Sequence, residues 1–145
     1  MFKHILIPTD GSELSLLAVE RGVQVALAFG AKVTGFHAIP AFHTFTYHAD
    51  MLEATRAEYV ASAKQSALKI LQALRDIAER AGVECDTQAA TSDHPHEAIV
   101  HAAQACGCDL IVMASHGRRG LQGFLLGSET QKVLTHSKLP VLVLR

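Results

Sequence analysis

Apolar and polar positions divide the chain of 145 residues into five short apolar or alternating segments and four amphipathic ones. The first kind predicts strands at residues 3–9, 32–39, 83–90, 109–114 and 140–145. The second kind carries apolar residues three and four positions apart, the period of a helix with one buried face. These predicted helices span 12–30, 51–81, 92–105 and 128–136. Regular alternation of strands and helices predicts an α/β fold with a parallel sheet covered on both faces.

Polar residues and glycines mark the ends of these helices. Ser12 is a suitable N-cap for the first helix, and Ser92 or Asp93 is the expected cap of the third. Glycines suited to helix ends follow the first three helices, at Gly30, Gly82 and Gly107. The apolar stripes expected to face inward are Leu16, Val19, Val23, Ala26 and Leu27, then Val60, Ala63, Ala67, Ile70, Leu74, Ile77 and Ala81, then Ala98, Ile99, Ala102 and Ala103.

The strands differ in ways that predict their place in the sheet. Residues 3–9, 109–114 and 140–145 are almost continuously apolar, which is typical of strands covered on both faces. Residues 83–90 alternate polar and apolar positions and fit an edge strand. Ligands of such sheets bind beyond the carboxyl ends of the strands, where the strand order reverses direction. The first and fourth strands end near Asp10 and Ala114, so we expect their following loops to meet.

Composition fits one domain over residues 1–145 and argues against several partners. With 49% apolar residues and a formal net charge of -1, the chain has no electrostatic reason to bind nucleic acid or an anionic membrane. No apolar run approaches the roughly 20 residues needed to cross a bilayer. The cysteines Cys85, Cys106 and Cys108 form no C-x-x-C motif, and we expect reduced thiols in a cytoplasmic protein.

Residues 113–128 are the most informative segment. They follow an apolar strand, contain four glycines and lead into a helix at Ser128. Backbone N–H groups in such a loop, together with the positive end of a helix, can hold an anion, most often a phosphate. The segment is neither a Walker A loop nor a G-x-G-x-x-G turn after the first strand. A flexible connection is the alternative, and the helix start at Gly127-Ser128 favours phosphate.

The motifs Pro8-Thr9-Asp10-Gly11-Ser12, Met113-Ala114-Ser115-His116-Gly117, Gly127-Ser128 and Pro140-Val141-Leu142-Val143 resemble the universal stress protein family over the whole chain. The ATP-binding branch of that family carries Gly-x-x-Gly-x9-Gly-Ser/Thr. Gly117, Gly127 and Ser128 match this pattern, but Ala114 replaces its first glycine. An alanine adds one methyl group and costs about 1 kcal/mol if the position needs a positive φ.

The resemblance implies a three-layer, doubly wound sheet in the order 3-2-1-4-5, of the adenine-nucleotide alpha-hydrolase-like type. It implies a cytoplasmic, regulatory stress-response protein that binds ATP, with Mg or Mn bridging the phosphates. It also implies a homodimer through the last strand, residues 141–145, where an apolar sheet edge itself favours pairing. A stress-response dimer without nucleotide and a slow ATPase are the alternatives.

The resemblance also assigns nucleotide-binding residues: Pro8, Thr9, Asp10, Ala38, Met113, Ala114, His116, Gly117, Arg118, Gly127, Ser128 and Glu129. Asp10 is expected to contact the adenosine, as an acceptor for ribose hydroxyls, although Asp before Gly-Ser is also ordinary turn chemistry. Ala38 and Met113 are expected beside the adenine, and Met113 also suits a core. Gly117, Gly127 and Ser128 are expected to hold the phosphates. His116 and Arg118 suit either phosphate contact or a solvated loop.

The residues do not favour three other kinds of chemistry. The nine histidines lack the Cys/His spacing of zinc sites, so we expect no metal held by the protein alone. Ser12, Ser115 and Ser128 have capping or loop explanations, so no catalytic triad or catalytic residue is assigned. A phosphoacceptor domain of two-component signalling would need an acidic residue at the end of the third strand, where Ala89-Ala90 stand.

Overall fold

The computed structural model describes residues 1–43, 49–117 and 125–145, with only the backbone of 49–52. The elements along the chain are β1 His4–Pro8, α1 Glu13–Phe29, β2 Lys32–Ile39, α2 Ala49–Arg80, β3 Cys85–Thr91, α3 Pro95–Ala105, β4 Leu110–Ala114, α4 Ser128–His136 and β5 Val141–Leu144. Every predicted strand and helix is therefore present, with ends that differ by at most a few residues.

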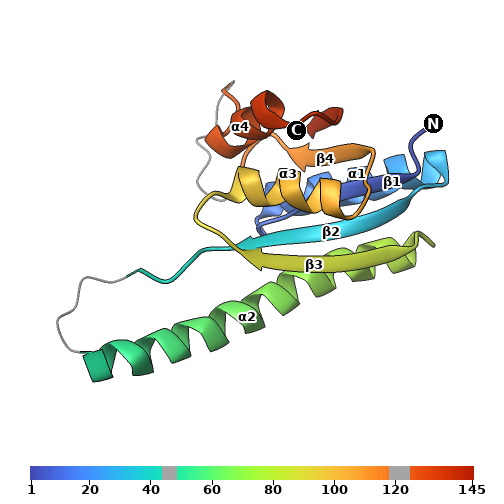
Figure 1. The fold of residues 1–145 in the computed structure, drawn as a ribbon. Helices are drawn as coiled ribbons and strands as arrows, with labels where there is room; N and C mark the ends of the chain where they lie inside the picture. The colour runs from blue at the N-terminus through green and yellow to red at the C-terminus, as the bar shows by residue number, and fades with distance from the viewer. Residues whose placement is uncertain (44–48, 118–124) are drawn as a thin grey trace.

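The strands form one parallel sheet in the predicted order β3-β2-β1-β4-β5 (Figure 1). The order reverses direction between β1 and β4. Pairing of β1 with β2 continues to Pro8 opposite Phe36, whereas its pairing with β4 stops at Leu6 opposite Ile111. The loops that follow β1 and β4 therefore leave the sheet at its switch point, the place where such sheets bind ligands.

Helices cover both faces of the sheet (Figure 1). Ile5 and Ile7 of β1 belong to the core beneath α1 and α2, and Leu6 between them belongs to the core beneath α3. All three side chains are fully buried. The almost continuous apolar character of β1 thus reflects a strand covered on both faces, because successive side chains point to opposite sides.

The ends of α1 confirm their prediction, whereas the start of α3 corrects one. Ser12 is the N-cap of α1, and Gly30 ends the helix in the left-handed region at φ 64°. The prediction that Ser92 or Asp93 caps α3 is wrong, because the N-cap is His94 and Pro95 follows it. Proline suits the first helical position because its fixed φ is helical and no N–H is needed there.

The buried face of α2 differs from the predicted stripe. Ala67 and Leu74 are buried as predicted, but Leu71 and Ala78 complete the face, and Val60 is 40% exposed. The first half of α2 extends beyond the sheet (Figure 1), so residues 53–66 include no buried side chain. Helical spacing alone identifies an apolar stripe but not how far the neighbouring layer reaches. Leu27 of α1 is likewise exposed against expectation.

The two edges of the sheet have different character. All of β3 is exposed or half-buried, which agrees with its predicted edge position. At the other edge, β5 is a short apolar strand with Leu142 exposed and no residue fully buried. The prediction that its continuous apolar run is covered on both faces is therefore wrong, because the strand has a neighbour on one side only. Over the described residues, no helix combines the length and apolar character that a membrane span requires.

Candidate functional site

The loops after β1 and β4 meet at the switch point, as predicted. Asp10 stands in the first loop and Gly117 in the second, and a Cβ built on Gly117 would lie 2.5 Å from Asp10 Oδ2. The carboxylate therefore lies directly against the backbone of the glycine loop. Glycine permits this close approach, because a side chain at position 117 would require the Asp10 carboxylate to shift.

Hydrogen bonds fix the turn that carries Asp10. Asp10 Oδ1 accepts from the N–H of Ser12 at 3.0 Å, the turn geometry that the sequence left open as one alternative. The other carboxylate oxygen lies toward Gly117. The turn role of Asp10 is thus observed, and it occupies Oδ1.

The two ends of the β4–α4 loop are drawn together. The N–H of Gly127 donates to the carbonyl of Ser115 at 2.8 Å. A Cβ on Gly127 would stand 3.2 Å from both Ser115 O and His116 Cα, which are backbone atoms that cannot rotate away. Gly127 has φ -60°, so close packing of two backbone segments, not backbone conformation, favours glycine.

The N-terminus of α4 lies where Gly127 contacts Ser115 and His116. Its N-cap is Gly127, which has no side chain to cap the helix, and the first intrahelical bond runs from Gln131 N to Gly127 O at 3.0 Å. The N–H groups of Ser128, Glu129 and Thr130 precede that bond and need acceptors from outside the helix backbone. Together with the helix dipole they suit an anion.

Ala114 does not have the positive φ that would make an alanine costly at this position of the motif. It is the last residue of β4, and no described residue other than glycine has a positive φ. Its carbonyl accepts from Thr130 Oγ1 at 3.1 Å, which ties β4 to α4. The methyl group is buried. The conformational cost considered for an alanine here therefore does not arise.

His116 has one satisfied and one unsatisfied ring nitrogen. Its Nδ1 lies 2.8 Å from Ser115 Oγ. Its Nε2 is buried and finds no hydrogen-bond partner among the described residues. A buried polar atom without a partner is costly in a folded protein and marks a place where an additional group can bind.

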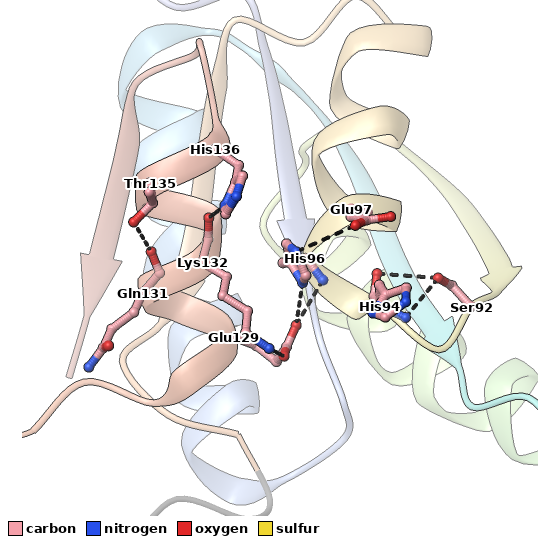
Figure 2. A network of polar contacts seen from close by, with 9 residues as sticks. All are labelled: Ser92, His94, His96, Glu97, Glu129, Gln131, Lys132, Thr135 and His136. Carbon is pink, nitrogen blue, oxygen red and sulfur yellow. Dashed lines mark hydrogen bonds and ion pairs between the residues drawn. The ribbon is translucent and has the colours of Figure 1, made fainter.

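Glu129 is directed toward α3 (Figure 2). Its Oε2 accepts from His96 N at 2.9 Å and lies 3.1 Å from His96 Nδ1, while Lys132 Nζ donates to Oε1 at 3.0 Å. Burial alone would raise the pKa of Glu129, but the hydrogen bonds from Lys132 and His96 outweigh it and lower the pKa. This carboxylate supplies the acceptor that His94, the N-cap of α3, does not provide.

The remaining predicted residues are distributed around the switch point. Pro8 ends β1, Thr9 is buried beside it, and Ala38 lies near the end of β2. Met113 is a buried residue of β4 and packs in the core beneath α3. Arg118 lies outside the described residues.

Three residues of this region were not identified from the sequence. His37 and Ser15 hold the Thr9–Asp10 turn, and His96 binds Glu129. A histidine next to Ala38 and a serine three positions after the Ser12 cap are visible signals. Their partners, however, lie on other elements.

Comparisons with known proteins agree with this architecture. A family model described as Universal stress protein family matches residues 1–145. The universal stress protein YxiE of Bacillus subtilis is 32% identical over 149 aligned residues that cover 100% of both chains. The structure of a hypothetical protein of Methanocaldococcus jannaschii, MJ0577, superposes with a TM-score of 0.80 at 30% identity and covers 99% of this chain and 96% of that one. A universal stress protein in complex with cAMP superposes with a TM-score of 0.73 at 29% identity, covering 99% and 97%.

Proposed function

The chain belongs to the universal stress protein family, and on this basis we propose that it binds an adenine nucleotide between the loops that follow β1 and β4. The proposed ligand is ATP, with Mg or Mn bridging its phosphates. The proposed role is regulatory, in a cytoplasmic stress response, and residues 1–145 act as one binding domain. The cAMP complex of a relative at 29% identity supports an adenine nucleotide as the class of ligand.

The observation that carries this proposal is the apposition of Asp10 and the glycine loop. The Asp10 carboxylate, a hydrogen-bond acceptor, stands next to Gly117, and its Oδ2 lies 2.5 Å from the place of a Gly117 Cβ. In the proposed complex Asp10 accepts from the ribose hydroxyls, and the phosphates lie beside the backbone of Gly117 and the N-terminus of α4. Ala38, Pro8, Thr9 and Met113 form the nucleoside end of the proposed site.

The phosphate end combines the backbone of the loop with the start of α4. Gly127 lets the start of α4 pack against the backbone of Ser115 and His116, which brings that helix end close to Gly117. Ser128 offers a hydroxyl and an N–H at the first position of α4. The unpartnered Nε2 of His116 gives a donor or acceptor there. Arg118 is proposed to offset phosphate charge, and Glu129 to form the outer wall through its contacts with α3.

The test is direct measurement of nucleotide. Purified protein is heat-denatured and the supernatant analysed for retained nucleotide, and the native protein is titrated calorimetrically with ATP in the presence and absence of Mg. We expect binding that Asp10→Asn weakens. The matched control Asp86→Asn, on the exposed edge strand β3, leaves binding unchanged. Absence of both retained nucleotide and titration heat overturns the proposal and favours a stress-response dimer that binds no nucleotide.

A homodimer through β5 belongs to the same proposal. β5 is an edge strand of four apolar residues, and Leu142 at its centre is 37% exposed. An exposed apolar edge with free backbone groups tends to pair with another strand, and a second copy offers the same edge.

A further inference from the structure

Thr9, one residue before Asp10, is held by hydrogen bonds at every polar atom. Its N–H donates to Phe36 O at 2.8 Å, and its carbonyl lies 2.8 Å from His37 Nδ1. Its Oγ1 accepts from Ser15 Oγ at 2.6 Å and from the N–H of Gly11 at 3.2 Å. Thr9 is 5% exposed, so these bonds lie within the protein and not at its surface.

The peptide group between Thr9 and Asp10 is hydrogen-bonded at both its carbonyl oxygen and its N–H. Its oxygen is held by His37 of β2, and its N–H donates to Ser15 Oγ of α1 at 3.3 Å. A peptide unit is planar, so fixing its oxygen and its N–H fixes its orientation. That orientation fixes the N–Cα bond of Asp10, and the bond from Ser12 N to Asp10 Oδ1 restrains the remaining rotation, so the two together set where the carboxylate stands relative to Gly117.

His37 must act as the donor in this contact. A carbonyl oxygen only accepts, so Nδ1 carries the hydrogen and the tautomer is set by Thr9. His37 is only 9% exposed and belongs to a different strand from Thr9, 28 positions away in sequence. Without it, the buried Thr9 carbonyl would lose its hydrogen-bond donor, and the peptide group would be held only through its N–H by Ser15.

We propose that His37 is a positioning residue for the nucleoside end of the site, acting through Thr9 to aim the Asp10 carboxylate at the ribose. This inference rests on the proposed function, because it assigns His37 to the recognition of a ligand that Asp10 contacts. It assigns no contact between His37 and the nucleotide itself. Its consequence is that selectivity for ribose hydroxyls depends on a side chain of β2 as well as on Asp10.

The experiment compares the affinities of ATP and 2′,3′-dideoxy-ATP, which lacks the ribose hydroxyls. We expect the wild-type protein to prefer ATP by about tenfold, the value of a hydrogen bond of ordinary strength. His37→Leu fills the space without a donor and is expected to reduce this preference to about twofold or less by weakening ATP binding alone. His37→Asn places an amide N–H near the position of Nδ1 and is expected to restore most of the preference.

His4→Leu is the matched control. His4 is also a buried histidine of the sheet and lies 2.7 Å from Thr34 Oγ1, but it stands at the amino end of β1, away from Asp10. Its replacement is expected to lower the melting temperature and leave the ATP preference at the wild-type value. If His37 only stabilised the fold, His37→Leu would likewise lower the melting temperature and leave the ATP preference unchanged.

The outcomes separate the inference from the proposed function. A folded His37→Leu protein with the wild-type preference, or a His37→Asn protein that loses it equally, overturns the positioning role while nucleotide binding stands. A wild-type protein that binds both nucleotides equally also overturns it, because Asp10 then does not recognise the ribose hydroxyls. If His37→Leu fails to fold, His37→Ala, which also lacks a donor, takes its place: a preference of about twofold or less supports the positioning role, and a wild-type preference overturns it. A wild-type protein that binds neither nucleotide overturns the proposed function and this inference together.

Discussion

The carboxylate of Asp10 lies against the backbone of Gly117, close enough that a Cβ at position 117 would stand 2.5 Å from Asp10 Oδ2. Two loops that are more than 100 residues apart in sequence thus meet at the switch point of the sheet. The contact joins the acidic group expected at the ribose to the glycine loop expected at the phosphates. It also makes the site sensitive to small changes on either side.

Gly117→Val is expected to weaken ATP binding at least tenfold while the protein remains folded. The new side chain displaces the Asp10 carboxylate and blocks the approach of phosphate to the loop backbone. Calorimetric titration measures the affinity, and circular dichroism checks the fold. The matched control is Gly30→Ala, at a positive φ with open space around it, which is expected to cost about 1 kcal/mol of stability without changing affinity. Unchanged ATP affinity in folded Gly117→Val would show that this loop is not the phosphate site.

Ala114→Gly is expected to change ATP affinity by less than about threefold. The residue ends a regular strand without a positive φ, so the glycine of the family motif relieves no strain here. A small loss of stability, about 0.5–1 kcal/mol, is expected because glycine weakens a strand. A gain of tenfold or more in ATP affinity would contradict this and would mean that the methyl group itself obstructs the ligand.

Glu129→Ala is expected to lower the free energy of unfolding by about 1 kcal/mol, as loss of a helix cap does. The substitution removes the acceptor for the N–H of His96 at the start of α3. Glu129→Gln keeps one acceptor oxygen and should cost less. Lys132→Ala removes only a half-exposed ammonium partner and should cost no more than about 0.5 kcal/mol. Urea denaturation measures all three, and equal losses for Lys132→Ala and Glu129→Ala would refute the capping role.

The contribution of Glu129 to the free energy of unfolding is expected to depend on pH. Hydrogen bonds lower the pKa of Glu129 in the folded protein below its ordinary value of 4.5, against the opposing effect of burial. The unfolded chain therefore takes up a proton at higher pH than the folded one, so this stabilisation is present above pH 4.5 and is lost as the pH falls below it. The stability difference between wild type and Glu129→Ala should accordingly shrink between pH 6 and about 3.5. A constant difference would exclude ionised Glu129 as its source.

His4 predicts a second pH dependence in a different range. Burial and the nearby Lys32 lower the pKa of His4 below 6.5 in the folded protein. The unfolded state then binds the proton more readily, so the contribution of neutral His4 is present above pH 6.5 and lost as the pH falls. His4→Gln, which does not titrate, should lose less stability than wild type between pH 7.5 and about 5.5. Parallel stability curves for the two proteins would contradict this assignment.

Leu142→Lys is expected to convert the proposed homodimer into a monomer. A charged side chain at the centre of β5 would lose its hydration if this edge paired with another strand. Proteins place charged residues on edge strands to prevent such pairing. Light scattering after size-exclusion chromatography measures the mass, with Leu68→Lys on the exposed face of α2 as the control. A dimer that survives Leu142→Lys but not Leu68→Lys would move the interface from β5 to α2.

The order of the elements could be predicted from hydrophobic period, caps and glycines, because these signals report on neighbouring residues. The parallel sheet and the meeting of the two loops followed from general rules for alternating strands and helices, and the strand order came from the family resemblance. The sequence did not determine that α3 begins at Pro95, or that Val60 and Leu27 stay exposed. These depend on how far the adjoining layers extend.

The polar side chains that hold the site together could not be identified before the fold was known. Asp10 and Gly117 were both visible as candidates, but the roles of His37 and Ser15 appeared only when β2 and α1 were brought to the Thr9–Asp10 peptide. Likewise, Glu129 could be assigned to a helix start but not to the backbone of α3, 33 residues earlier in the chain. Sequence patterns encode burial and local conformation, whereas a hydrogen bond depends on distances of about 3 Å that only the packed fold establishes.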